Sequence, residues 1–389
     1  MKILLVHNRY QQPGGEDVVA AAEAELLRRR GHSVTLVEVD NQAIRGWAAK
    51  LGTAVTTPYN PFRRAWMAEQ VRRWGSEVVH VHNFFPRLSP AVLDGAADAG
   101  AAAVHTMHNY RSICANGLML RNDLPCEQCL AGGKWQAVRH HCYRGSCAGT
   151  AAVVAMQQLA KWRNAWNRPG RRLIALSHFA RSKLIAGGIP PQRIVIKANF
   201  VDLPAQVVHR DARTGVLYVG RLAVEKGVHI FTDAARRLPH LRFTMIGAGP
   251  EEGVLRRRAP PNLHIAGAMP HDATREAIAN AQLLVLPSLW FEGLPMTLLE
   301  AFAAGTSVIA SRIGSLHETV LDRMNGRTFA PGDAADLAAV IAELDADDDA
   351  RAALGRRARA TAEAQFAPDA NGKRLEAIYE DALAELGRG

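Results

Sequence analysis

A strand–loop–helix pattern in the C-terminal half constrains the fold of this chain more than any other feature. Residues 283–287 form a short apolar run, which predicts a buried parallel strand. Gly293 and Pro295 then break the chain, and Pro295 suits the first turn of a helix. Residues 296–304 have the apolar density of a buried helix, and Gly305 is expected to end it. Such a unit belongs in an α/β fold with a parallel sheet.

Two glutamates lie in this unit, Glu292 in the loop and Glu300 inside the helix. In an open parallel sheet, ligands bind at the carboxyl ends of the strands, and the N-terminal amides of a helix favour anions. The loop and the first turn of the helix are therefore expected to line one anion-binding pocket. The other residues assigned to this pocket are Gly293, Leu294, Pro295 and Met296.

The whole pattern, E-G-x-P-x-x-x-x-E-A over residues 292–301, resembles the retaining nucleotide-sugar glycosyltransferases of family 4. The resemblance implies that Glu292 holds the hydroxyls of a donor sugar and that Glu300 holds the ribose of its nucleotide. The alternative is two unrelated acids, one solvated and one capping a helix.

A basic turn earlier in the chain predicts a phosphate site. Residues 219–227 read V-G-R-L-x-x-x-K-G, which places Arg221 and Lys226 five residues apart across a tight turn after a strand. Two cations so placed can converge on one diphosphate. In the resembled family this pair neutralises the leaving diphosphate, whereas the alternative is a solvated basic turn.

The resemblance adds two further elements to this donor site. Residues 246–250 read I-G-x-G-P, which matches the glycine turn of the family and assigns Gly247 and Gly249 to the donor site. The strand that ends at Met269 commonly meets the nucleotide base in this family.

The N-terminal segment predicts a β-α-β opening, with strands at 1–6 and 33–39 around a helix at 18–30. It lacks the G-x-G-x-x-G fingerprint of dinucleotide-binding proteins. Gly14 and Gly15, in the first loop, would let the backbone approach a ligand closely. The resemblance implies that this loop faces the donor phosphates and the acceptor; a plain tight turn is the alternative.

Two histidines stand near the ends of predicted strands: His82 in the strand at 78–83 and His108 in the strand at 104–110. The carboxyl ends of parallel strands share one edge, so both rings are expected to face the same side of the sheet. In the resembled family a histidine at such a strand end lies near the transferred sugar. The resemblance gives this role to His108, where it would position the sugar or pass a proton.

Four cysteines in the segment 111–147 form two pairs separated by twelve residues. They are Cys126, Cys129, Cys142 and Cys147. Two such pairs in a reducing compartment favour tetrahedral zinc over disulfides, and a structural zinc would hold this irregular insert without a large core. Four free thiols are the alternative.

Charge is unevenly distributed along the chain. Residues 1–200 hold 26 Lys and Arg against 12 Asp and Glu, a balance of +14, and residues 201–389 hold 21 against 25, a balance of −4. A one-sided basic surface suggests an anionic membrane or a polyanionic substrate. Nucleic acid is the competing hypothesis, but no nucleic-acid-binding module is recognisable. The expected location is the cytoplasm, peripheral to the inner face of the membrane.

Together these features predict the GT-B fold, in which two Rossmann-like doubly wound domains face a central cleft. The expected domains are an acceptor-binding domain at 1–200, which contains the Cys-rich insert, and a nucleotide-sugar domain at 201–365. A final helix at 366–389 is expected to cross back to the first domain.

The expected function is sugar transfer, with retention, from a UDP- or GDP-sugar to a glycan or polyprenyl-linked acceptor in envelope or polysaccharide synthesis. No catalytic metal is expected, because Arg221 and Lys226 would supply the positive charge. Two alternatives remain. One is an epimerase or hydrolase of nucleotide sugars with this fold, and the other is a non-catalytic protein that binds anionic polymers.

Overall fold

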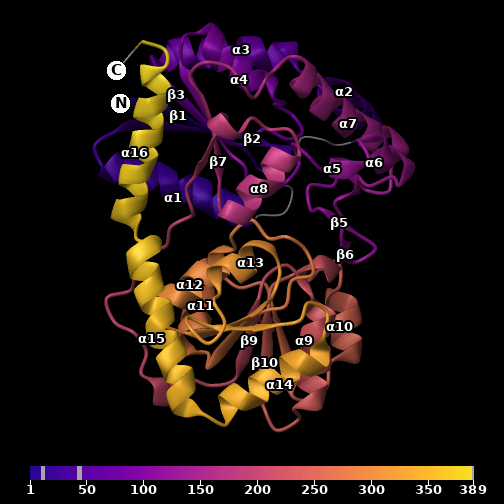
Figure 1. The fold of residues 1–389 in the computed structure, drawn as a ribbon, viewed down its shortest axis with the longest axis vertical. Coiled ribbons are helices and arrows are strands. Elements are labelled where there is room, and N and C mark those ends of the chain that lie inside the picture. Colours follow the sequence, from indigo (N-terminus) through magenta and orange to yellow (C-terminus); the bar gives the residue numbers. More distant parts are fainter. Residues whose placement is uncertain (10–13, 42–45, 388–389) are drawn as a thin grey trace. The chain divides into compact units, whose positions relative to one another are not determined.

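The computed structural model describes residues 1–9, 14–41 and 46–387, and the chain divides into two compact units (Figure 1). The first unit comprises Met1–Met119, Cys126–Ala198 and Asp369–Gly389. The second comprises Leu120–Pro125 and Asn199–Pro368. Each unit is built on its own six-stranded parallel sheet, as the alternation of apolar runs and helical segments predicts.

The sheet of the first unit has the strand order β2-β1-β3-β4-β7-β8. Its strands are β1 (Lys2–Arg9), β2 (Ser33–Asp40), β3 (Val78–Asn83), β4 (Ala102–Thr106), β7 (Arg171–Ala175) and β8 (Ile194–Ile196). The chain order reverses between β1 and β3, which pair directly in a parallel register. In open α/β sheets such a reversal marks the place where ligands bind, outside the carboxyl ends of the strands.

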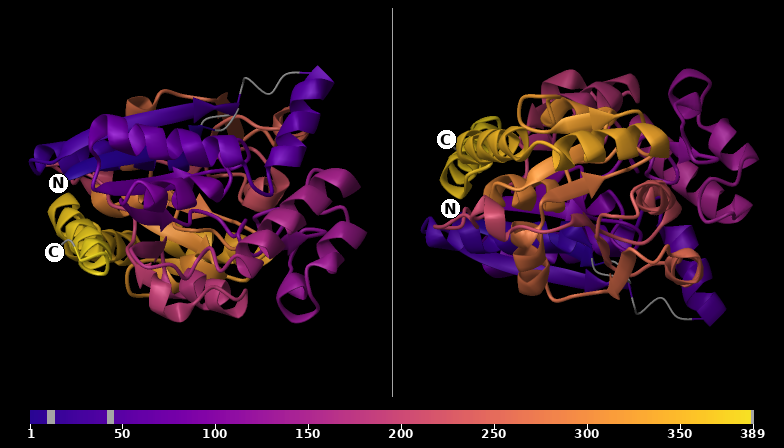
Figure 2. Two further views of the ribbon diagram at one scale, coloured as in Figure 1. Left: turned by 90° about the horizontal axis from the view of Figure 1, so that it is seen from above. Right: turned by 90° about the horizontal axis from the view of Figure 1, so that it is seen from below.

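The first unit also contains helices. They are α1 (Gly15–Arg29), α2 (Gly46–Thr56), α3 (Pro61–Trp74), α4 (Ala91–Asp98), α5 (Gln128–Ala131), α6 (Trp135–Arg139), α7 (Cys147–Trp162), α8 (His178–Ala186) and α16 (Pro368–Ala384). Figures 1 and 2 show α16, in yellow, alongside the N-terminal strand. The contact is apolar: Leu375, Ile378 and Tyr379 of α16 share one buried cluster with Ile3 and Leu5 of β1. Burial of this face holds the last helix on the first sheet.

The sheet of the second unit has the order β11-β10-β9-β12-β13-β14, the arrangement of a Rossmann sheet. Its strands are β9 (Val216–Val219), β10 (Phe243–Ile246), β11 (Leu263–Gly267), β12 (Leu283–Leu286), β13 (Ser307–Ser311) and β14 (Arg327–Phe329). Its helices are α9 (Val228–Arg237), α10 (Glu252–Arg258), α11 (His271–Asn280), α12 (Met296–Ala304), α13 (Gly314–Thr319), α14 (Ala334–Asp345) and α15 (Asp348–Gln365). Its reversal lies between β9 and β12, which also pair directly.

Several elements predicted from the sequence are confirmed, and one strand is shorter than predicted. α12 begins at Met296, and Gly305 ends it with φ of 65°. However, β4 ends at Thr106, so His108 lies in the loop beyond the strand.

The segment 111–147 is irregular, as predicted, with short helices and a small hairpin of β5 (Leu120–Arg121) and β6 (Leu124–Pro125). None of the helices in the described part of the chain is long and apolar enough to span a membrane.

Candidate active site

The candidate site of the second unit lies where its strand order reverses. β9 leads into the basic turn, with η4 (Val224–Lys226) at its end, and β12 leads into the loop that carries Glu292. These two strands are neighbours in the sheet, so both loops leave its carboxyl edge side by side. The fold thereby brings together two motifs that stand 66 residues apart in the sequence.

An ion pair joins the two motifs. The Nζ atom of Lys226 donates to both carboxylate oxygens of Glu292, at 2.8 and 3.0 Å. The hydroxyl of Ser288 donates to the same carboxylate at 2.6 Å, and the Lys226 ammonium lies 5.2 Å from the centre of the Trp290 ring. Glu292 is only 4% exposed, so its charge depends on these partners.

A glycine fixes the approach of the two loops. Gly227 follows Lys226 with φ of 70°, and a Cβ atom added there would lie 1.8 Å from the carbonyl oxygen of Pro287. Any other residue would therefore push the basic turn away from β12. A backbone bond of 2.9 Å from the Leu289 amide to the Glu225 carbonyl holds the loops at this distance.

Arg221 has a different partner from Lys226. Its guanidinium forms an ion pair with Glu225, and its carbonyl oxygen accepts a hydrogen bond of 2.8 Å from the Tyr218 hydroxyl. Burial, together with the carboxylates of Glu292 and Glu225, raises the pKa of Tyr218 well above its usual value. The tyrosine is therefore a neutral donor that holds the basic turn. The Arg221 side chain is about half exposed and accessible to a ligand.

Glu300 lies within α12 and is largely buried. It contacts His271, whose Nε2 atom lies 2.8 Å from its Oε1 atom. Asn199, the first residue of the main part of the second unit, donates from Nδ2 to the Leu294 carbonyl at 3.0 Å. The loop before α12 is thus held by a side chain from the start of the unit.

The predicted glycines have separate structural settings. Gly247 has φ of 142°, and a Cβ atom there would meet the Gly220 carbonyl oxygen at 1.9 Å, so the packing of two loops requires a glycine. Gly249 lies next along the same turn, and Met269 is partly exposed beyond β11. Gly14 caps α1, and its amide donates to Asp17 at 2.7 Å. Gly15 begins that helix, and residues 11–13 of the predicted loop lie outside the described residues.

In the first unit, the two predicted histidines are brought together. The Nδ1 atom of His82 and the Nε2 atom of His108 are 3.0 Å apart, and the rings are stacked. Burial, and next the neighbouring His82, lower the pKa of His108 well below its usual value, so the ring is neutral. Its position at the carboxyl edge of this sheet agrees with the predicted location.

Beside them lies a buried group of Glu23, His80 and His82, whose ligand-type atoms all lie within 4.8 Å of one another. Among the described residues, no other group of three or more His, Cys, Asp or Glu side chains comes this close together. The ammonium of Lys197 already contacts the Glu23 carboxylate at 2.5 Å. Because this carboxylate already has a cation, we do not assign a metal to the group.

The four predicted zinc ligands do not lie as close together as the ligand-type atoms of Glu23, His80 and His82. Within the described ranges, no three of Cys126, Cys129, Cys142 and Cys147 bring their sulfurs within 4.8 Å of one another. Cys147 is exposed at the start of α7. Burial, and then the nearby Cys114 and Cys126, raise the pKa of Cys129. The zinc site therefore stays a prediction from the spacing alone.

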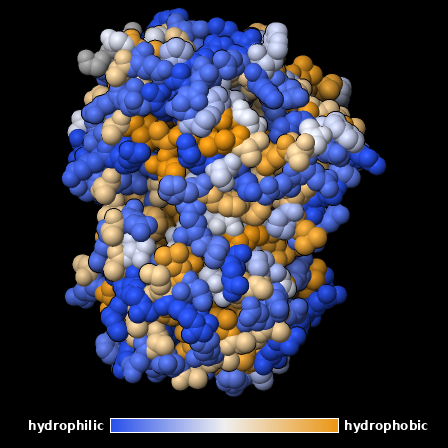
Figure 3. Space-filling view, viewed as in Figure 1, coloured by the Kyte–Doolittle hydropathy of each residue, from blue (hydrophilic) through white to orange (hydrophobic). Residues whose placement is uncertain are grey.

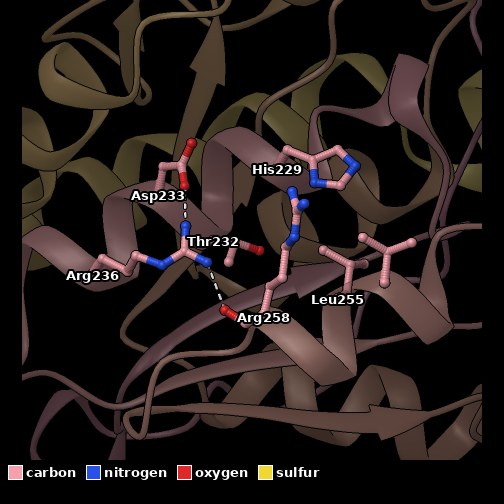
Figure 4. Close-up of a pocket in the computed structure, with 7 residues that line it drawn as sticks. His229, Thr232, Asp233, Arg236, Leu255 and Arg258 are labelled. Carbon is pink, nitrogen blue, oxygen red and sulfur yellow. Dashed lines mark hydrogen bonds and ion pairs between the residues drawn. The ribbon is translucent and has the colours of Figure 1, made fainter.

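A separate small pocket of about 180 Å³ lies between α9 and α10 (Figure 4). Its polar lining includes His229 and Arg258, while the guanidinium of Arg236 is held by Asp233 and by the Arg258 carbonyl. None of the residues that line it belongs to the motifs described above.

Several residues that contact the predicted site residues were not predicted from the sequence. Ser288 and Trp290 stand four and two residues before Glu292 in the same loop, and this short spacing could have indicated that they contact the site. The other missed residues are Glu225, His271, Glu23 and Lys197. Glu23 and Lys197 are far apart in the sequence, and no local pattern indicates that they meet.

Two family models match the chain. Residues 13–204 match "Glycosyltransferase Family 4", and residues 202–361 match "Glycosyl transferases group 1". Both are domain families of glycosyltransferases, and together they account for both units. The two matches together span residues 13–361, so both units match glycosyltransferase domains.

Curated relatives agree with these domains. Glycogen synthase of Mycobacterium tuberculosis is 39% identical over 166 residues, which are 39% of this chain and 38% of that protein. The match thus spans about two-fifths of the length of the first curated relatives. A phosphatidyl-myo-inositol mannosyltransferase of Mycolicibacterium smegmatis is 26% identical over 371 residues, 90% of this chain and 86% of that protein.

Solved structures show the same fold. Anabaena HepE in complex with UDP matches with a TM-score of 0.69 at 17% identity, over 98% of this chain and 100% of that one. Sucrose-phosphate synthase of Thermosynechococcus elongatus matches with a TM-score of 0.72 at 17% identity, over 99% and 100% of the two chains. The predicted GT-B fold, with two Rossmann-like domains, is confirmed.

Proposed function

We propose that this protein transfers a sugar, with retention at the anomeric carbon, from a UDP- or GDP-sugar to a glycan or polyprenyl-linked acceptor. The observation that carries the proposal is the pairing of Lys226 with Glu292 at the carboxyl edge of the second sheet. The pairing supports the proposal because it holds a cation, which can bind a diphosphate, beside a carboxylate, which can accept from sugar hydroxyls. Similarity to Anabaena HepE, which was solved with UDP and with UDP-glucose, supports a nucleotide-sugar donor.

In this proposal the donor diphosphate takes the place of Glu292 at Lys226 and contacts the accessible Arg221. Both cations stabilise the negative charge that develops on the departing diphosphate, which is electrostatic catalysis. Glu292 then accepts hydrogen bonds from the donor sugar, Glu300 binds the ribose, and His108 lies near the transferred sugar. With no nucleophile assigned, departure and attack occur on the same face of the sugar.

The donor site is tested by a thermal-shift panel of UDP, GDP, ADP and their sugar conjugates on wild type and Lys226→Ala. A ligand at 100 times its Kd stabilises the folded state by about 2.7 kcal/mol, which raises Tm by roughly 5–10 °C for a domain of this size. We expect one nucleotide to produce this shift in wild type and none to produce it in Lys226→Ala.

Each shift is measured against the same variant without ligand, because Lys226→Ala leaves the buried Glu292 unpaired and lowers the starting Tm. Arg257→Ala, which removes an exposed cation from α10 of the same unit, is the matched control and should keep the full shift. If no nucleotide raises the Tm of wild type at millimolar concentration, the donor-site assignment is wrong.

We further propose that the acceptor is presented at an anionic membrane, to which the first unit binds peripherally from the cytoplasmic side. The balance of +14 over residues 1–200, which supply most of this unit, supports this, as do large apolar side chains on its surface. Trp47 of α2 and Trp162 of α7 are 80% and 81% exposed. The two helices pack together, and Figure 3 shows apolar side chains there among hydrophilic ones. Exposed tryptophans among basic residues are typical of a surface that inserts into a lipid interface.

A Trp47→Ser/Trp162→Ser variant should bind liposomes that contain anionic lipid about tenfold more weakly than wild type, because two interfacial anchors are lost. Co-sedimentation over a series of anionic lipid contents measures this. Met324→Ser, which removes an exposed apolar side chain from the second unit, should bind as wild type does. Binding that does not depend on the anionic lipid content would contradict the proposal, since the electrostatic contribution should grow with surface charge.

A further inference from the structure

Beneath the histidines of the first unit lies a fully buried charge pair that the proposed chemistry does not use. Glu23 projects from α1 and has 0% exposure, and Lys197, which follows β8, is 3% exposed. The ammonium of Lys197 donates to Oε1 of Glu23 at 2.5 Å. A buried ion pair is costly to desolvate and contributes little net stability, so its presence suggests another role.

The pair keeps the carboxylate charged. Burial alone would raise the pKa of Glu23, but the charge of Lys197, and after it His82, hold this pKa well below its usual value. An ionised carboxylate only accepts hydrogen bonds. Its Oε2 atom faces Nε2 of His82 at 3.3 Å, and within the described part of the chain neither of these two buried atoms has another hydrogen-bond partner.

This contact decides the proton positions of two rings. Burial lowers the pKa of His82, so the ring is neutral and carries one N–H. Facing a carboxylate, that proton belongs on Nε2, which leaves Nδ1 of His82 as an acceptor. The atom 3.0 Å from Nδ1 is Nε2 of His108, which must therefore be the donor. His108 then carries its lone pair on Nδ1.

A third histidine lies next to the Glu23 carboxylate but is not part of the series of contacts from Glu23 through His82 to His108. His80 lies 3.7 Å from Oε2 of Glu23 through Nδ1. Its ring is held on both sides, at 2.8 Å by the Tyr379 hydroxyl and at 2.8 Å by the Thr106 hydroxyl. The carboxylate thus has neighbours on β3, which carries His80 and His82, and beyond β8, where Lys197 lies.

We propose that Glu23 and Lys197 are positioning residues that act through His82 to set the tautomer and orientation of His108. In this order the Nε2–H of His108 donates to Nδ1 of His82, and the Nε2–H of His82 points at Oε2 of Glu23. The lone pair of His108 on Nδ1 is then available to accept from a sugar hydroxyl or to take a proton. The inference rests on the proposed function for its catalytic consequence, but the tautomer itself does not depend on that function.

The test compares wild type with Glu23→Gln/Lys197→Met, which removes both charges together and leaves no lone buried ion. Long-range ¹H–¹⁵N correlation spectra of the full chain labelled in histidine report which ring nitrogen carries the proton. Signals are assigned with His82→Asn and His108→Asn. We expect the Nε2–H tautomer at both rings in wild type and a mixture in the variant, because a carboxamide can accept or donate.

Transfer kinetics provide the second measurement. We expect kcat to fall about 10- to 100-fold in the double variant, as for other partners that orient a functional histidine. KM for the donor and Kd for the nucleoside diphosphate should stay within about twofold, since the donor contacts lie in the second unit. Glu25→Gln, on the same helix with its side chain 61% exposed, is the control and should change neither the tautomer nor kcat.

A wild-type His108 with its proton on Nδ1 would overturn the inference, as would a folded double variant with unchanged tautomers and unchanged kcat. If the double variant does not fold, the wild-type spectrum alone decides. If wild type neither binds a nucleotide nor transfers a sugar, the proposed function is wrong, while the tautomer measurement still tests the order of hydrogen bonds.

Discussion

A Glu292→Gln variant should transfer sugar about 100- to 1,000-fold more slowly than wild type, yet bind the free nucleoside diphosphate at least as tightly. The carboxylate of Glu292 contacts Lys226 at 2.8 and 3.0 Å, so an incoming diphosphate has to compete with it for the ammonium. The carboxamide is the same size and keeps an oxygen for the Ser288 hydroxyl, but it no longer neutralises Lys226.

The loss of transfer has a separate cause. Charge-assisted hydrogen bonds from sugar hydroxyls to a carboxylate are about twice as strong as bonds between neutral groups. Losing one such contact in a preorganised site costs about two to three orders of magnitude in rate. Initial rates of transfer and calorimetric titration with the nucleoside diphosphate measure the two effects independently.

Glu363→Gln serves as the matched control, because Glu363 is half exposed on α15 and pairs only with Arg359 among the contacts described. It should leave both the rate and the affinity unchanged. A Glu292→Gln enzyme that transfers sugar at the wild-type rate would remove this residue from the site. Weaker binding of the free diphosphate would show that the carboxylate supports Lys226 rather than competing for it.

An Asp94→Ala variant should be about 3–5 kcal/mol less stable than wild type, with a melting temperature lower by roughly 6–20 °C in the transition of the first unit. Asp94, on α4, is 1% exposed and lies 3.4 Å from the guanidinium of Arg171, which is equally buried. Arg163, Arg168 and the Tyr59 hydroxyl contact the same carboxylate at 3.4, 3.5 and 3.1 Å.

The physical reason is an uncompensated buried cation. Burial lowers the pKa of Arg171 to about 10 even with Asp94 beside it. Without the carboxylate, the guanidinium would keep only the carbonyl oxygens of Ala165 and Leu93 as acceptors among its described contacts. Thermal unfolding followed by circular dichroism at pH 7.5 measures the change.

Asp98→Ala, one turn further along α4, is the control for this prediction. Asp98 pairs with Arg64 at 2.5 Å, with both side chains about one-third exposed, and pairs of this kind contribute about 0–1 kcal/mol. Its melting temperature should therefore remain close to that of wild type. Equal losses in the two variants would show that burial of Asp94 does not determine its contribution.

Much of the fold could be predicted from local patterns. The strand before the Glu292 loop, the helix after it and the glycine that ends this helix were predicted correctly, because apolar runs and glycine C-caps are local signals. Gly227 and Gly247 also stand in short motifs, and the structure explains them by the close approach of two loops. Strand ends were less certain, as the end of β4 at Thr106 shows.

Partners of the candidate residues could not be predicted in the same way. Lys226 meets Glu292 because β9 and β12 are neighbours in the sheet, although other elements separate them in the sequence. Glu23 meets Lys197 because α1 packs near the end of β8, 174 residues later. The choice of partner for a buried charge follows from strand order and helix packing, which no spacing in the sequence records.

The sequence by itself determined the two-domain α/β architecture and indicated the motifs that are proposed to bind the donor, because periodicity, turn residues and short spacings are local properties of a chain. Only the tertiary structure decided which side chains neutralise one another. It paired Lys226 with Glu292, and it placed Glu23 and Lys197 beneath His82 and His108. Those pairings depend on desolvation, because a charge inside the protein requires a partner at a distance that only the complete packing sets.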